Sequence, residues 1–126
     1  MLAALAVLAA AAAGASFDEV NVSHMAGSQA EVAVAVDPAR PGVLFAASNT
    51  LDFKSFGALG NLMRTYSSAD GGATWTGGAG PVPTPYGGKK RCNAGDPAPA
   101  IDTTGRQYLA FLASACISVE SLFDKA

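Results

Sequence analysis

An eight-residue tract, 68–75, holds the polar side chains with the most specific spacing in this chain. It reads S-A-D-G-G-A-T-W. The side chains of Ser68 and Asp70 can accept hydrogen bonds from backbone amides a few residues further on, which closes a turn locally. Gly71 and Gly72 can adopt the positive φ angles that such a turn needs. Asp70 also has the carboxyl group that general acid catalysis uses, but the turn already accounts for it. The tract therefore predicts a structural role.

The two cysteines, Cys92 and Cys116, are the thiols of the chain. A hairpin folded about the turn at 102–105 would bring them opposite each other, and in an exported protein such a pair forms a disulfide. Two free, half-buried thiols are the alternative. We expect no metal site and no cofactor, because the single histidine, His24, is remote in sequence and no C-x-x-C pair occurs.

Two further charged groups are candidates for binding. Asp52 follows the second apolar run after the leader and could face a ligand, with a solvated loop residue as the alternative. Lys89, Lys90 and Arg91 form the one basic cluster. The cluster could attract an acidic sugar, or it could be a solvated part of a loop.

The elements that must position these residues have a β pattern. Apolar runs at 31–36 and 43–48 flank a turn that holds two prolines and a glycine, which predicts a hairpin. Residues 62–68 and 74–76 are two further expected strands. In the first run valine alternates with alanine, so both faces of the strand are apolar. This pattern is typical of a sheet that is packed between two others.

The chain also repeats itself. PAPAID at 97–102 echoes VAVAVD at 32–37, at an offset of 65, and QYLAF at 107–111 echoes VLFAA at 43–47, at an offset of 64. A period near 64 residues with about four short strands is typical of a β-propeller blade. The alternative is that any two hairpins resemble each other at this level of detail.

Residues 1–15 are expected to be a secretory signal peptide with a helical core. They contain no charged side chain, and the A-G-A triplet that ends at Ala15 fits the small-x-small cleavage pattern. Cleavage before Ser16 would leave 16–29 as a flexible N-terminal segment. No Lys or Arg precedes the apolar run, which departs from the usual pattern, and an alanine-rich buried helix is the alternative. We expect a secreted, extracellular protein, with the periplasm or the cell surface as the other compartments.

The 68–75 tract resembles the Asp box, or bacterial neuraminidase repeat, of the sialidase-like β-propellers. The positions that define the box all match: Ser68, Asp70, Gly72, Thr74 and Trp75. The stretches 31–49 and 92–113 are similar to the opening strands of successive blades in secreted bacterial, exo-alpha-sialidase-like members. In that family the box is structural and lies away from the catalytic centre, which implies that these residues determine the fold. A chance D-G-G turn is the alternative.

The resemblance implies an all-β fold, a β-propeller of four-stranded antiparallel blades within residues 30–126. Blade one would cover about 30–80, and a partial second blade about 92–126. The mature chain then makes about 1.7 blades, whereas a propeller needs roughly four to eight. The sequence is therefore interpreted as the N-terminal fragment of a longer propeller whose remaining blades are missing from it. Closure by several copies and a small β-sandwich are the alternatives.

The resemblance also implies glycoside hydrolysis. Sialidases hold the sugar carboxylate with arginines and use a Tyr-Glu nucleophile pair with an Asp acid/base. The F/Y-R-I-P motif that carries the first arginine is absent, so no catalytic residue is identified and the chain is expected to be inactive by itself. The alternatives are a non-catalytic propeller that binds a glycan or a cell-surface protein, and a structural cell-surface repeat.

Composition excludes several other classes. The formal net charge of -2 argues against a nucleic-acid binder. No apolar run reaches the roughly 18 residues that a membrane span needs. Beyond residue 15 the composition is that of an ordinary globular chain, which excludes collagen-like, coiled-coil and disordered proteins.

Overall fold

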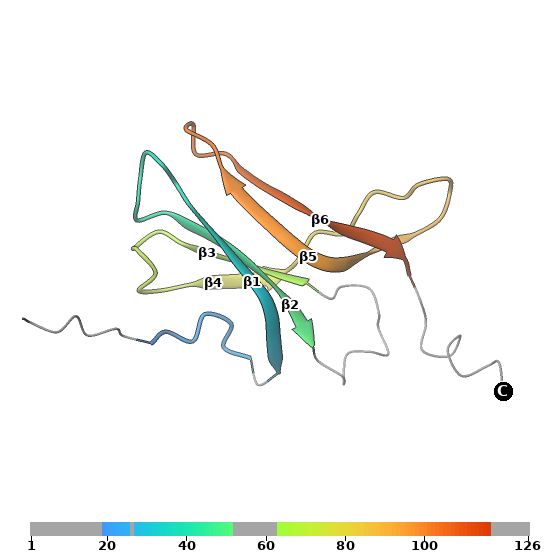
Figure 1. Ribbon diagram of the computed structural model, residues 1–126, viewed down its shortest axis with the longest axis horizontal. Coiled ribbons are helices and arrows are strands. Elements are labelled where there is room, and N and C mark those ends of the chain that lie inside the picture. Colours follow the sequence, from blue (N-terminus) through green and yellow to red (C-terminus); the bar gives the residue numbers. More distant parts are fainter. Residues whose placement is uncertain (1–18, 26, 52–62, 117–126) are drawn as a thin grey trace, which may run out of the picture.

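The computed structural model describes residues 19–25, 27–51 and 63–116, and their regular secondary structure is entirely β (Figure 1). The strands are β1 (Ser28–Val36), β2 (Leu44–Leu51), β3 (Met63–Ser68), β4 (Thr76–Ala79), β5 (Arg91–Ile101) and β6 (Gln107–Ala115). They form a four-stranded antiparallel sheet in the order β1-β2-β3-β4 and a two-stranded antiparallel sheet of β5 and β6. The prediction of an all-β chain is confirmed at this level.

The first sheet is a meander in which each strand pairs with the next. The hairpin predicted from the runs at 31–36 and 43–48 is confirmed, and the last ladder pair before its turn is Val36 with Leu44. The strand expected at 62–68 corresponds to β3. The pairing joins strands that follow each other in sequence, so short turns set the register of the whole sheet.

The strand expected at 74–76 is wrong in position, because β4 begins only at Thr76. The amide of Thr74 and the indole nitrogen of Trp75 are both hydrogen-bonded to residues of the preceding turn. These bonds keep the two residues out of the ladder, which starts with Thr76 opposite Ser67.

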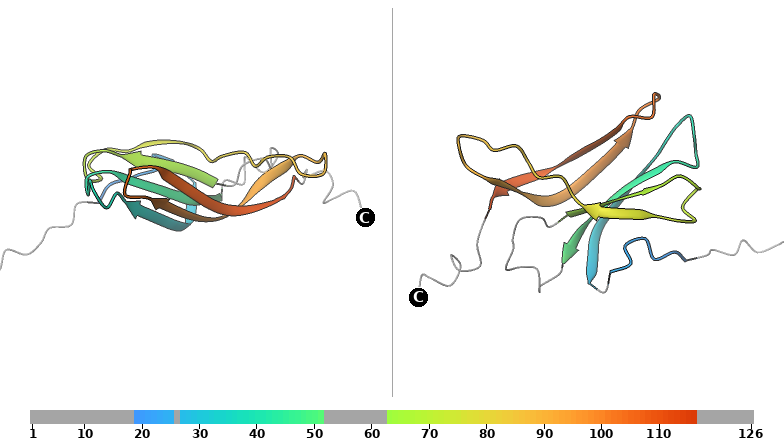
Figure 2. Two further views of the ribbon diagram at one scale, coloured as in Figure 1. Left: turned by 90° about the horizontal axis from the view of Figure 1, so that it is seen from above. Right: turned by 180° about the vertical axis from the view of Figure 1, so that it is seen from behind.

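The core lies between the two sheets. β5 packs across β1 and β2 and touches β3, whereas β6 lies farther from the first sheet (Figures 1 and 2). Phe45, Ala47 and Met63 are buried, the last two with no exposed surface. Gly95 of β5 comes so close to β2 that a Cβ there would lie 2.5 Å from Oδ1 of Asn49. Small residues on the facing strands therefore allow the sheets to approach closely.

The two faces of β1 have different surroundings. Ala33 and Ala35 are half-buried, whereas Val32, Val34 and Val36 are 68%, 59% and 51% exposed. The alternation predicted a strand covered on both faces. Within the described part of the chain only the alanine face is covered, by β5, and we call the other side the valine face.

Some predictions concern residues outside the described ranges. They are the signal peptide with its cleavage between Ala15 and Ser16, the loop residue Asp52, and the part of the expected second blade beyond residue 116. The described residues 19–25 precede β1 without regular secondary structure. No helix in the described ranges is long and apolar enough to cross a membrane.

Candidate functional site

The polar residues of the 68–75 turn come together between β3 and β4. The Ser68 hydroxyl accepts the amide of Gly72 at 2.9 Å and donates to Oδ1 of Asp70 at 2.8 Å. Asp70 accepts the amide of Thr74 at 2.9 Å and the hydroxyl of the same residue at 2.6 Å. Nε1 of Trp75 donates to the carbonyl of Gly72 at 2.9 Å. The side chains of the turn are therefore bonded mainly to the turn itself.

Asp70 is held as a carboxylate. Hydrogen bonds from the Thr74 side chain, from the Thr74 amide and from the Ser68 hydroxyl lower the pKa of Asp70 to about 2. Both of its oxygens are engaged in these bonds. A group with this pKa is deprotonated at neutral pH and cannot act as a general acid there. The geometry assigns Asp70 to the turn.

Two other aspartates close hairpin turns in a similar way, 65 residues apart in sequence. Oδ1 of Asp37, after β1, accepts the amides two and three residues later, at 2.9 and 3.1 Å. Oδ1 of Asp102, after β5, accepts the amides two and four residues later, at 2.8 and 3.0 Å. The Asp37 amide donates to the Val43 carbonyl at 2.9 Å, and the Asp102 amide to the Arg106 carbonyl at 3.0 Å. The sequence repeat thus corresponds to a repeated hairpin end.

Asp102 is also ionised at neutral pH. The Thr104 side chain, the Arg106 amide and the Tyr108 hydroxyl donate to it and lower the pKa of Asp102 to about 2. The Tyr108 hydroxyl lies 2.9 Å from Oδ2, and this bond raises the pKa of Tyr108. Neither side chain can exchange a proton readily near neutral pH.

The turns that end the two hairpins lie against each other. Asp37 has no exposed surface. Burial acts to raise the pKa of Asp37, but hydrogen bonds from the Ala39 amide and from Arg40 outweigh it and lower that pKa. Nη2 of Arg40 lies 2.7 Å from Oδ2 of Asp37 and also touches the second turn at Gly105, where a Cβ would overlap it. The absence of a side chain at Gly105 lets Arg40 fit between the turns.

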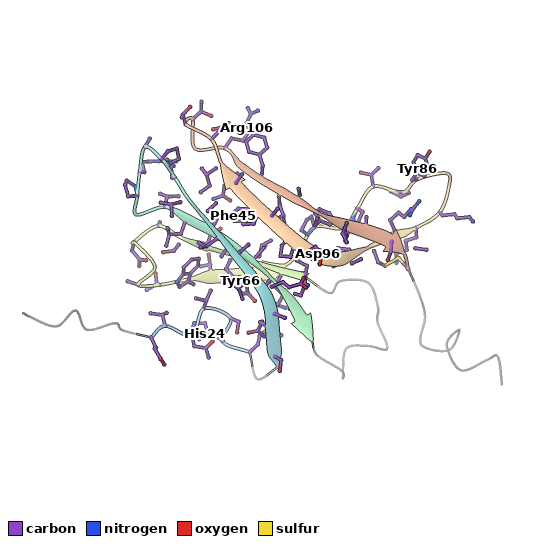
Figure 3. All side chains as sticks on the ribbon, in the orientation of Figure 1. His24, Phe45, Tyr66, Tyr86, Asp96 and Arg106 are labelled. Atoms are coloured by element: carbon purple, nitrogen blue, oxygen red, sulfur yellow. A yellow bond between two sulfur atoms is a disulfide. The ribbon has the colours of Figure 1, made fainter. Side chains whose placement is uncertain are left out.

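A second contact joins the same two strands farther from the turns. Glu31 and Asp96 stand in β-bulges of β1 and β5, again 65 residues apart, with φ angles of 51° and 54°. Such positive φ values are uncommon for residues other than glycine. A hydrogen bond between the two side chains, together with repulsion from the Asp96 charge, raises the pKa of Glu31. Figure 3 shows Asp96 where β5 crosses the first sheet.

The chemistry open to this carboxylate pair is the sharing of a proton. Nδ2 of Asn49 donates a further hydrogen bond to Glu31. Neither carboxylate lines the cavity described below. Sequence reasoning missed the pair, although both acids occupy the same position of the repeat. Their contact joins the sheets, and within the described ranges no group of three or more His, Cys, Asp or Glu could hold a metal ion.

Cys92 and Cys116 form a disulfide, which confirms the predicted bond. The pairing behind that prediction differs, because Cys92 stands opposite Ser114 in the ladder. Two irregularities in β5 shift the register between the turn and the open end of the hairpin. The bond therefore runs diagonally, from β5 to the residue that follows β6.

An open cavity of about 420 Å³ lies on the valine face of the first sheet. Its lining consists of Val20, Asn21, Val22, Ser23, Gln29, Val32, Val34, Ala46, Ser48, Tyr66 and Trp75. The hydroxyls of Ser48 and Tyr66, both buried, lie 3.2 Å apart. The cavity can receive an apolar group beside a hydroxyl pair, but its lining contains no charged side chain.

The predicted basic cluster is remote from the 68–75 turn. Lys89, Lys90 and Arg91 follow the loop from β4 to β5, which extends away from both sheets, and Figure 3 shows Tyr86 on this loop. The structure therefore brings together the residues of the turn and the two cysteines, but it does not bring the cations to either group.

Comparisons with protein-family models, with curated proteins and with solved structures find no match for this chain.

Proposed function

We propose that this chain is part of a secreted, sialidase-like Asp-box β-propeller that acts on glycans outside the cell. In this proposal the two sheets are neighbouring blades, and the 68–75 turn is the Asp box of the first. The proposal combines the match at the five positions of the box with the local closure of the turn between two antiparallel strands.

The observation that carries the proposal is the packing of two repeats in register. Residues 65 positions apart meet across the sheets: Glu31 contacts Asp96, and Arg40 from one hairpin turn rests on Gly105 of the other. Blades of a propeller are repeated sheets arranged around a common axis. Unrelated hairpins in a sandwich have no reason to bring equivalent residues together.

The surfaces left open fit the same proposal. The valine face of the first sheet is exposed, and so are Tyr108 and Leu112 on β6, at 48% and 56%. A propeller covers such faces with further blades, supplied by the same polypeptide or by other copies. The disulfide between Cys92 and Cys116 supports an oxidising compartment, as an exported protein would meet.

A second candidate is a non-catalytic propeller that binds a glycan or a cell-surface protein. It is favoured by the state of the aspartates that close the turns. Asp37, Asp70 and Asp102 are ionised and engaged in hydrogen bonds within their own turns, so none of them is available as the acid that hydrolysis requires.

The two candidates are separated by assaying the secreted protein with a fluorogenic sialoside and on a glycan array. Release of the fluorophore would support glycosidase action. Binding to glycans without turnover would support the second candidate. A folded protein that neither hydrolyses the sialoside nor binds any glycan would contradict a role on glycans altogether.

A further inference from the structure

The loop between β4 and β5 contains a small hairpin of its own, residues 86–91, which we call the basic hairpin. The amide of Tyr86 donates to the Lys89 carbonyl at 3.2 Å, and the amide of Lys89 donates to the Tyr86 carbonyl at 3.1 Å. Gly87 and Gly88 between them have φ angles of 60° and 71°. Two residues of positive φ are what the tightest hairpin turns need. The loop therefore holds its side chains on a defined turn.

The basic hairpin carries an exposed aromatic ring beside three consecutive cations. Tyr86 is 75% exposed, and the Arg91 guanidinium lies 5.6 Å from the centre of its ring. Lys89 and Lys90 are exposed. None of the three cations forms an ion pair with an acid of the described residues, where Arg40 and Asp37 do form one. Their charge is therefore available to a partner.

The base of the basic hairpin is fixed. Arg91 is the first residue of β5, and the next residue, Cys92, is tied to Cys116 by the disulfide. A surface held in this way loses little conformational freedom when a partner binds.

We propose that the basic hairpin binds an anionic polysaccharide that carries carboxylate or sulfate groups. Lysine and arginine side chains complement such groups, and the open side of the Tyr86 ring offers a flat apolar surface for a sugar ring. The tip of the hairpin is Gly87-Gly88, with no aliphatic side chain to enter a lipid layer. The net charge of -2 disfavours a nucleic-acid partner. This inference takes from the proposed function only that the protein acts outside the cell.

The test uses the full chain with an intact disulfide, titrated with oligosaccharides of heparin and of polygalacturonate at low salt. We expect Lys90→Gln to weaken binding about threefold and Lys89→Gln with Lys90→Gln about tenfold. Tyr86→Ala should also weaken binding to both sugars. The matched control is Arg106→Gln, which removes an exposed cation from the other end of the second sheet (Figure 3) and should leave the affinity unchanged.

Several outcomes would overturn the inference. They are no binding of either polysaccharide by the unaltered chain, equal losses in Lys90→Gln and Arg106→Gln, or preference for phosphatidylserine vesicles or a DNA oligomer over both polysaccharides. Binding of neutral glycans that persists while these polyanions are ignored would refute the basic hairpin as a site and leave the proposed function standing.

Discussion

Aspartate side chains close three turns of this molecule by accepting hydrogen bonds from amides within a few residues. Asp70 and Asp102 have both oxygens bonded in this way, and Asp37 adds an ion pair with Arg40. Contacts of such short range can be predicted from sequence, because the spacing of Asp, Gly and Thr alone defines them. The contact of Glu31 with Asp96 could not, because it depends on how two sheets pack.

The first residue-scale prediction concerns Gly105, which has a φ of 82° and lies against Arg40. Gly105→Ala should lower the free energy of unfolding by about 2–3 kcal/mol, because it adds left-handed strain and also displaces the guanidinium from its place beside Asp37. The matched control is Gly87→Ala, at a φ of 60° with no atom near the new Cβ, which should cost about 1 kcal/mol. Urea denaturation measures both. Equal costs would mean that the two turns do not touch in solution.

The second prediction concerns the Glu31–Asp96 pair. The bond to Asp96 raises the pKa of Glu31 above its ordinary 4.5. The folded state thus holds the proton more tightly than the unfolded chain, and its stability falls as the pH rises from 4.5 through the raised pKa. Asp96→Asn removes the like charge, so its melting temperature near pH 7 should exceed that of the unaltered chain, and the fall with pH should shrink.

Asp96→Gly is the companion variant, because it removes both the charge and the positive-φ strain at this position. It should stabilise the protein at low pH as well, where Asp96→Asn should have little effect. Melting curves between about pH 4 and pH 8 separate the two contributions. If neither variant raises the melting temperature, the two acids do not meet in solution.

At the scale of elements, the β5–β6 hairpin shows what a sequence-based register can and cannot provide. The pairing next to the turn follows from its position, with Ile101 opposite Gln107. Farther out, the irregularities near Gly95 shift the ladder, so the cysteines are bonded diagonally. Bulges respond to packing against the other sheet, and nothing in the local pattern of β5 announces them.

Reduction of the disulfide should lower the free energy of unfolding by about 3 kcal/mol, because the bond closes a loop between residues separated by 24 positions. Urea denaturation with and without a phosphine reductant measures the difference. A variant with alanine at both Cys92 and Cys116 should match the reduced protein and should not respond to the reductant. An unchanged transition on reduction would show that the bond is not formed in the purified chain.

At the scale of the whole molecule, two repeats contact each other at three levels. The turns touch through Arg40 and Gly105, the bulges through Glu31 and Asp96, and the strands through the close approach of Gly95 to Asn49. The sequence predicted the repeat and most strands, since these follow from alternation and turn residues. It did not predict which face of β1 stays open, because covering a face depends on the number of sheets present.

These contacts make the two sheets one unfolding unit, and acid provides the test. Hydrogen bonds hold the pKa of Asp70 and of Asp102 at about 2, below the ordinary 3.8. The stability that these bonds supply is complete above pH 3.8 and is lost as the pH falls from there toward 2, when the folded carboxylates take up protons. The melting temperature should therefore drop steeply in this window, with a single transition by circular dichroism.

Asp70→Asn and Asp102→Asn should each make that drop shallower, although the two residues belong to different sheets. Glu19→Gln, at an exposed position before β1, controls for the loss of one carboxylate charge and should leave the slope unchanged. Because the turns and bulges of the two hairpins are packed together, each variant should move the whole transition. Two separate transitions, one shifted by each variant, would show that the sheets unfold independently and that the contacts between the repeats are weak in solution.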